Sequence, residues 1–302
     1  MAVRATLVES CTEREKKTMT TSHAPAGRAV AAPRSTASSL LVKVPAITAL
    51  FWVVKILTTG MGESASDWLL NRGEGLPGLG LPGALIIDGG LFVVAFALQL
   101  AVRRYVPAVY WLAVSAIAVV GTVVADITHF LIGVPLGLVT VVCLAVIAAT
   151  FALWQRTEKT VSIHSVTRGR RETYYWVMVF FTFILGTALG DFTASSLNLG
   201  FLGSIFLFAA LMAATAVAYF RFHVNAIAAF WVAYVLTRPL GASIVDYLAV
   251  PPQEGGIDLG TGPVTWVSAA VIIALVAYMA VTHQRTTSSG SSPAAIGERA
   301  GR

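Results

Sequence analysis

Long apolar runs alternate with short polar connections along most of the chain. Each run is close to or above the roughly 20 residues that cross a hydrocarbon core of about 30 Å, and none alternates polar and apolar residues as a barrel strand would. The pattern therefore predicts an all-α integral membrane protein with eight transmembrane helices. The runs cover about residues 43–66, 81–102, 106–131, 134–154, 173–197, 199–220, 224–248 and 263–283.

A tryptophan, a glycine and an aspartate recur in every second run, spaced ten and then five residues apart. Successive sets are separated by enough chain for two membrane crossings, so the repeating unit is a helix pair. Because each unit crosses twice, the sequence predicts four parallel two-helix repeats. The sets are Trp52, Gly62 and Asp67; Trp111, Gly121 and Asp126; Trp176, Gly186 and Asp191; and Trp231, Gly241 and Asp246.

The repeats also set the expected domain boundaries. Both ends of the chain are rich in small and polar residues without an apolar period, and we expect them to be disordered cytoplasmic tails. The tails are 1–42 and 286–302, and the four repeats are 43–105, 106–172, 173–223 and 224–285.

Composition and charge agree with a membrane protein. Of the 302 residues 56% are hydrophobic and only 12% are charged, and the net charge is +6. The basic residues gather in the tails and in the even-numbered connections, so the positive-inside rule predicts that both termini are cytoplasmic. We expect a multi-pass membrane protein, with the lipid bilayer as its partner. No nucleic-acid-binding motif accompanies the scattered basic residues, so a nucleic-acid partner is not expected.

The first repeat resembles a known family. The stretch KVPAITALFWVVKILTTGMGESASD, from Lys43 to Asp67, is similar to the first repeat of the bacterial membrane-anchored protein family built from four tandem repeats of domain of unknown function 347. The resemblance extends to about His283. It implies an eight-helix integral membrane protein of the bacterial cytoplasmic (inner) membrane and no settled activity.

One face of each odd-numbered helix carries polar residues at helical spacing, and such faces contact protein or water rather than lipid. We expect the odd helices to line a shared polar path with the even helices outside. The candidate cation-binding residues are Glu63, Asp67, Asp126, Asp191 and Asp246, and the candidates for charge pairing or gating are Lys55, Asp88 and Arg238.

Several of these residues have a simpler interpretation. The aspartates either form a ring at the outer mouth or cap the helices that follow them. The repeated tryptophans are more typical of packing or interface anchoring, and the repeated glycines of close helix packing, than of substrate contact. Lys55 and Asp88 lie at similar depths and could form a structural ion pair.

Glu63 differs because it occurs in one repeat only, where Thr122, Thr187 and Ala242 stand at the matching positions. Intramembrane ionisable residues are costly, and a functional role is the default hypothesis for them. Glu63 and Asp67 lie one helical turn apart and could together hold a hard metal ion or pass a proton. His129, three residues after Asp126, could extend this acidic site, although a lone histidine there more often makes an interfacial hydrogen bond.

No catalytic motif appears in a supporting context, so we expect neither an enzyme nor a cofactor. The favoured function is a permease or transporter for a small cation, a divalent metal ion or a proton-coupled solute, that uses the intramembrane carboxylates. The alternative is a non-transporting sensor, stress or scaffold protein in which the polar stripes only hold the bundle together.

Overall fold

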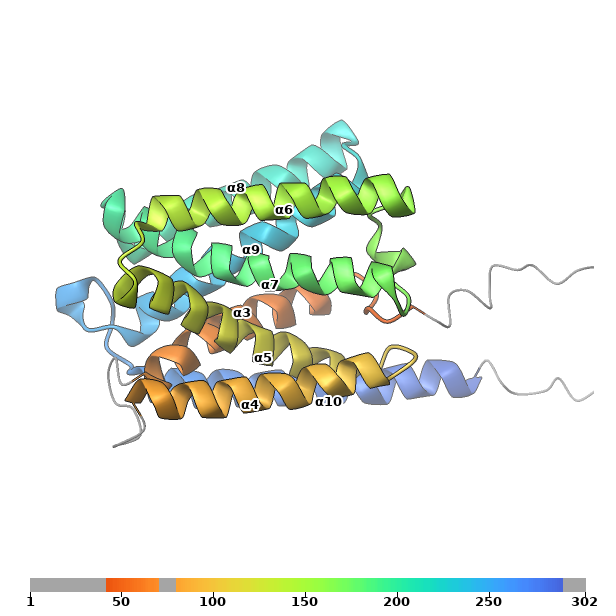
Figure 1. Ribbon diagram of the computed structural model, residues 1–302, viewed down its shortest axis with the longest axis horizontal. Coiled ribbons are helices and arrows are strands. Elements are labelled where there is room, and N and C mark those ends of the chain that lie inside the picture. Colours follow the sequence, from red (N-terminus) through yellow and green to blue (C-terminus); the bar gives the residue numbers. More distant parts are fainter. Residues whose placement is uncertain (1–41, 71–79, 290–302) are drawn as a thin grey trace, which may run out of the picture. The chain divides into compact units, whose positions relative to one another are not determined.

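Long helices form each of the apolar segments (Figure 1). The computed structural model describes residues 42–70 and 80–289, which belong to the compact unit Ser39–Arg302. Every regular element in these two ranges is helical. The α-helices are α3 (Ala49–Leu69), α4 (Gly80–Ala101), α5 (Pro107–Asp126), α6 (Leu136–Glu158), α7 (Arg170–Asp191), α8 (Gly200–Phe222), α9 (Ala226–Ala249) and α10 (Thr261–Ser289). The short elements are the π-helices η1 (Ile127–Leu131) and η3 (Phe192–Ser196) and the 3-10 turns η2 (Ile163–Ser165) and η4 (Pro252–Glu254).

The predicted count of eight membrane spans is met only in part. Of the described helices, 7 are long and apolar enough to cross a membrane, which indicates a multi-pass membrane protein. The exception is α3, which has 21 residues but carries Lys55, Glu63 and Asp67 among its apolar ones. The helix lies among α5, α9 and α10, so its polar side chains meet protein and it does not need an apolar surface all round.

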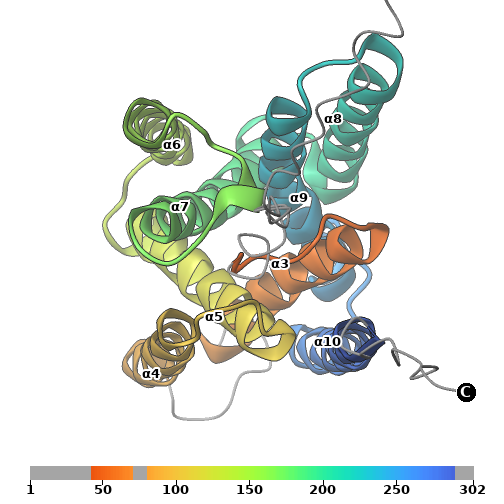
Figure 2. The same cartoon turned by 90° about the vertical axis from the view of Figure 1, so that its right-hand side faces the viewer.

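The helices form an inner and an outer set, as the polar stripes predict. In the apolar window of α5 with η1, and of α7 with η3, 67% of the residues are buried, compared with 22% for α4 and 11% for α8. Figure 2 shows α3, α5, α7 and α9 grouped together, with α4, α6, α8 and α10 around them. The outer helices expose large apolar side chains, among them Ile86, Phe206 and Trp266, as expected of a surface in contact with lipid.

The four repeats pack in a closed cycle. Each inner helix contacts the inner helices of the repeats before and after it, and α9 contacts α3 to complete the ring. Each outer helix packs mainly on the inner helix of the next repeat: α4 on α5, α6 on α7, α8 on α9, and α10 on α3. A single repeat would therefore leave its apolar surfaces uncovered, and the ring buries them only when all four are present.

The repeated glycines lie where consecutive inner helices approach each other most closely. A Cβ added at Gly62 would lie 2.8 Å from the backbone carbonyl carbon of Ala118, and one added at Gly241 would lie 2.9 Å from the carbonyl oxygen of Ile56. Small residues allow this approach between helix backbones. Each glycine faces the residue three positions before the glycine of the next repeat: Gly62 faces Ala118, Gly121 faces Phe183, Gly186 faces Arg238, and Gly241 faces Thr59.

The tails expected to be disordered lie almost entirely outside the described residues. The exception at the C-terminal end is a correction to the predicted boundary, because α10 continues to Ser289 and therefore includes residues 286–289.

Candidate functional site

Glu63 lies at the centre of the inner ring. Its Oε2 accepts hydrogen bonds from the hydroxyls of Thr122, at 3.0 Å, and Thr187, at 2.8 Å, and these two hydroxyls lie 3.1 Å apart. The three residues come from α3, α5 and α7 and occupy the same position in three consecutive repeats. Side chains from three separate helices therefore fix this carboxylate, which is 5% exposed.

Two buried cations lie along the inner helices, at positions one and two turns before the Glu63 position. Arg238 Nη1 donates to Thr59 Oγ1 at 2.8 Å, and its guanidinium lies over the ring of Phe183. Lys55 Nζ lies 3.9 Å from the ring centroid of Tyr234 and 4.8 Å from that of Phe183. Both cations are 0% exposed, and within the described part of the chain Lys55 Nζ has no hydrogen-bond acceptor. Contacts with aromatic faces compensate part of the cost of burying these charges.

The suggested ion pair between Lys55 and Asp88 is not formed. Lys55 points inward at the rings of Tyr234 and Phe183, whereas Asp88 belongs to the outer helix α4, which packs mainly on α5. Asp88 is 4% exposed, and its Oδ2 has no hydrogen-bond partner in the ranges the structure describes. The prediction paired the two residues because they lie at similar depths in the membrane. Depth does not determine the direction in which a side chain points.

The inner helices begin at one end of the bundle, called here the aromatic end. Large aromatic side chains close this end. In each repeat, the aromatic residue directly before the repeated tryptophan in the sequence contacts the tryptophan of the next repeat. The fourth repeat contacts the first in the same way. The centroid distances are 5.7 Å for Phe51 and Trp111, 5.8 Å for Tyr110 and Trp176, 6.3 Å for Tyr175 and Trp231, and 5.6 Å for Phe230 and Trp52. The tryptophans thus pack the core and join the repeats.

A segment without regular secondary structure, residues 42–48, packs at this aromatic end. Lys43 N donates to Val166 O at 3.0 Å, and Tyr105 N donates to Val42 O at 3.2 Å. The Lys43 side chain is 1% exposed, donates to Gln99 O at 2.9 Å and forms an ion pair with Glu172 of α7. The segment is therefore held by two of the connections at this end, those after α4 and α6, and by a buried ion pair.

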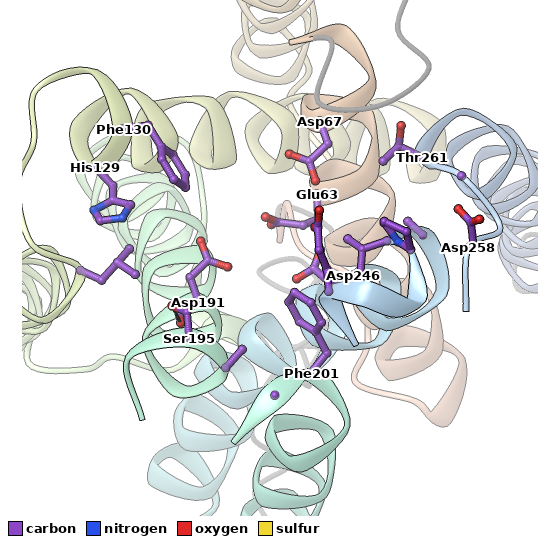
Figure 3. Close-up of a pocket in the computed structure, with 18 residues that line it drawn as sticks. Glu63, Asp67, His129, Phe130, Asp191, Ser195, Phe201, Asp246, Asp258 and Thr261 are labelled. Atoms are coloured by element: carbon purple, nitrogen blue, oxygen red, sulfur yellow. Dashed lines mark hydrogen bonds between the residues drawn. The ribbon is translucent and has the colours of Figure 1, made fainter. Parts of the chain in front are cut away.

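The opposite end, where the inner helices finish, opens into a cavity of about 710 Å³ (Figure 3). It is called here the acidic cavity, because six of the side chains that line it are carboxylates: Glu63, Asp67, Asp191, Asp246, Glu254 and Asp258. Its lining also includes His129, Phe130, Ser195, Phe201 and Thr261. Three of the four repeat aspartates line it, whereas the fourth, Asp126, is 3% exposed and is not part of the lining. The predicted ring of four is thus incomplete at the cavity wall.

Two of the aspartates end an α-helix without capping the next one. Helix α5 ends at Asp126 and continues as the π-helix η1, and α7 ends at Asp191 and continues as η3. The N-caps of the following helices α6 and α8 are Pro135 and Leu199, and neither makes a side-chain capping bond. Capping therefore does not explain Asp126 or Asp191. The π-helices place His129, Phe130 and Ser195 at the cavity, a use typical of such insertions near functional sites.

The connection after α9 brings two further carboxylates. Residues 250–260 fold back on the end of α9, with Ile257 N bonded to Tyr247 O at 2.9 Å and Asp258 N to Val250 O at 2.9 Å. This fold places Glu254 and Asp258 at the cavity. The sequence analysis did not place either residue in the candidate site, although both follow Asp246 closely in the same repeat.

The carboxylates line the cavity without forming a compact metal site. Within residues 42–70 and 80–289, no group of three or more His, Cys, Asp or Glu side chains is close enough to hold a metal ion. The suggested metal pair, Glu63 and Asp67, therefore gains no third ligand from the described residues. His129 belongs to the cavity wall, where its Nδ1 lies 2.9 Å from Val134 O.

Comparison with known proteins gives the family. The model of the Repeat of Unknown Function (DUF347) matches residues 50–105, 109–160, 174–225 and 229–285, which are the four helix pairs described above. No curated protein and no solved structure matches the chain. The four tandem matches cover most of the chain, and the protein therefore belongs to the DUF347 repeat family.

Proposed function

We propose that this protein is a membrane permease for small cations. The observation that supports the proposal is the order of charged groups along the inner ring. Carboxylates line a cavity at one end, Glu63 lies at the inner limit of this cavity, and the positive charges of Arg238 and Lys55 lie beyond it. A cation drawn in by the carboxylates would reach Glu63 and then meet two buried cations.

The described conformation corresponds to a state closed at one end. Beyond Glu63 lie Arg238, Lys55 and the rings of the aromatic end, and these groups would close the path in this state. A carrier must expose its site to one side at a time, so transport requires a second state in which these groups move aside. The polar contacts that join the repeats, such as Arg238 with Thr59, would be exchanged in that transition.

Flux through proteoliposomes tests the proposal. Purified protein is reconstituted, and tracer uptake is measured for Na⁺, K⁺, Mg²⁺, Mn²⁺ and small organic cations, against protein-free liposomes. We expect at least one cation to be taken up, and we expect E63Q and D67N to remove that uptake. The matched control is D88N, which neutralises a buried carboxylate outside the cavity lining. Absence of uptake for every cation, or equal uptake by E63Q, would reject the permease.

The second candidate function is a non-transporting membrane protein with structural polar contacts. The observation that favours it is that the polar groups of the stripes bond to each other across repeats: Glu63 with Thr122 and Thr187, and Arg238 with Thr59. These bonds would hold the ring closed whether or not anything passed through it. The same flux assay separates the two functions, because the structural interpretation requires no uptake.

The orientation that we propose places the acidic cavity outside the cell and both termini in the cytoplasm. The basic residues of the connections support this orientation. In intact cells, a membrane-impermeant thiol reagent is expected to label D258C at the cavity and to leave K159C, on the connection after α6, unlabelled. Labelling of K159C alone would reverse the orientation.

A further inference from the structure

Acidic side chains predominate among the described residues that line the acidic cavity. The six carboxylates come from α3, α7, α9 and the connection after α9, and the one basic side chain among the described lining residues is His129. The buried cations Lys55 and Arg238 are not part of the lining and form no ion pair with the cavity carboxylates in the described ranges. A concave wall rich in carboxylates raises the local concentration of positive ions, so the cavity favours a cationic ligand.

Two of these carboxylates are buried and incompletely satisfied. Asp246 is 8% exposed, lines the cavity, and its side chain has no hydrogen bond or ion pair with any described residue. Glu63 is 5% exposed, and both of its threonine donors bond to Oε2, which leaves Oε1 without a donor from the described residues. A buried carboxylate without partners is costly, and a ligand that brings both positive charge and N–H donors would remove that cost.

The shape of the site fits an organic ion better than a bare metal ion. A hard metal ion needs six or more oxygen ligands at short range, and among the described residues no three acidic, histidine or cysteine side chains are gathered for this purpose. The volume of about 710 Å³ is that of a pocket for an organic molecule. Phe201 lines the same cavity, and an aromatic ring attracts an alkylammonium group (Figure 3).

We propose that the acidic cavity binds an organic ammonium ion, with its N–H donors on Asp246 and Glu63 and its hydrocarbon part beside Phe201. This inference names the cargo class of the permease and rests on that proposed function for its role in transport. Binding itself is independent of transport, which allows the two to be tested separately.

The experiment is a binding titration on the full chain in lipid nanodiscs. Isothermal titration calorimetry measures n-butylammonium, its neutral analogue 1-butanol, tetraethylammonium, which has the charge without N–H donors, and Mn²⁺ and Mg²⁺. We expect saturable binding of n-butylammonium, no binding of 1-butanol, and weaker binding of tetraethylammonium. We expect D246N to weaken n-butylammonium binding at least tenfold and D88N to leave it unchanged.

A second variant tests the site independently, in case D246N does not fold. F201A changes the cavity wall without altering a buried charge, and we expect it to weaken binding of n-butylammonium several-fold; gel filtration and circular dichroism verify the fold of both variants. The inference is overturned if n-butylammonium does not bind, if it binds D246N and F201A as well as the native protein, or if 1-butanol binds equally well.

Binding and flux fail independently of each other. Saturable n-butylammonium binding without any cation flux would reject the permease and keep the ammonium site. Flux of Mn²⁺ or Mg²⁺ through a protein that does not bind n-butylammonium would keep the permease and reject the ammonium site.

Discussion

Thr187 in the third repeat donates a hydrogen bond of 2.8 Å to Glu63 in the first, across 124 residues of sequence. The two residues hold the same position in their repeats, one place after the repeated glycine. Thr122, at this position in the second repeat, also donates to Glu63, and Ala242 holds it in the fourth. Residues that share a position in the repeat thus meet inside the ring, so the Glu63 carboxylate depends on helices α5 and α7.

Replacement of Thr187 by valine is expected to destabilise the protein by about 1–2 kcal/mol, because Glu63 loses a donor in a buried site. Denaturant unfolding in detergent micelles, followed by circular dichroism, measures the change. The matched control is T150V on the outer helix α6, where the hydroxyl bonds only to the backbone of its own helix. In an E63Q background the cost of T187V should fall, and an unchanged cost would show that the bond to Glu63 is not its cause.

Substitution of Gly62 by alanine is expected to destabilise the ring by more than about 1 kcal/mol. The new methyl group would lie 2.8 Å from the backbone of Ala118, so α3 and α5 must move apart. The control is G90A on α4, where an added Cβ meets nothing within 4 Å. Since alanine favours a helix over glycine by up to about 1 kcal/mol, G90A should be neutral or stabilising. Similar melting temperatures for the two variants would contradict this account.

Closure of the ring between the fourth and first repeats can be tested by a disulfide. A Cβ at Gly60 would lie 3.4 Å from Val245 Cβ, just below the range of about 3.5–4.5 Å found in disulfides. With Cys11 and Cys143 replaced by alanine, G60C with V245C should cross-link under mild oxidation. A protease site inserted between α6 and α7 then yields two fragments that stay joined until reduction. The pair G90C and V245C should separate after cleavage, and separation of the G60C pair would contradict the closed ring.

The repeat is what made much of the fold predictable. Trp52, Gly62 and Asp67 recur at fixed spacing, so the sequence alone predicts helix pairs, their parallel direction and an inner set of polar helices. The partners across the ring were not predicted. A pattern along one chain gives the direction of a side chain relative to its own helix, but not which helix lies opposite, and this is why Lys55 was matched by depth to Asp88 instead of to the rings of Tyr234 and Phe183.

The aspartates of the acidic cavity could be predicted from the sequence, whereas the other residues of its wall could not. Asp67, Asp191 and Asp246 belong to the repeated pattern, and all three line the cavity. Phe130 and Ser195 reach it through the π-helices η1 and η3, and a one-residue widening of a helix has no sequence period that would reveal it. Asp258 reaches it because the connection after α9 folds back by backbone hydrogen bonds, which are independent of side-chain type.

The buried ion pair of Lys43 and Glu172 gives a prediction at the aromatic end of the ring. The residues are 1% and 2% exposed, and the pair ties segment 42–48 to α7. Removal of one partner leaves an uncompensated buried charge, so K43M alone or E172M alone is expected to cost about 3–5 kcal/mol of unfolding free energy. The double variant K43M with E172M should cost clearly less than the sum, because no buried charge remains.

Denaturant titration of the native protein, the two single variants and the double variant completes the thermodynamic cycle. The control R171A, which breaks the more exposed pair with Glu158 at 2.9 Å, should cost no more than about 1 kcal/mol. Additive effects of K43M and E172M would show that the two side chains are not coupled, and the ion pair would then not be what ties segment 42–48 to α7.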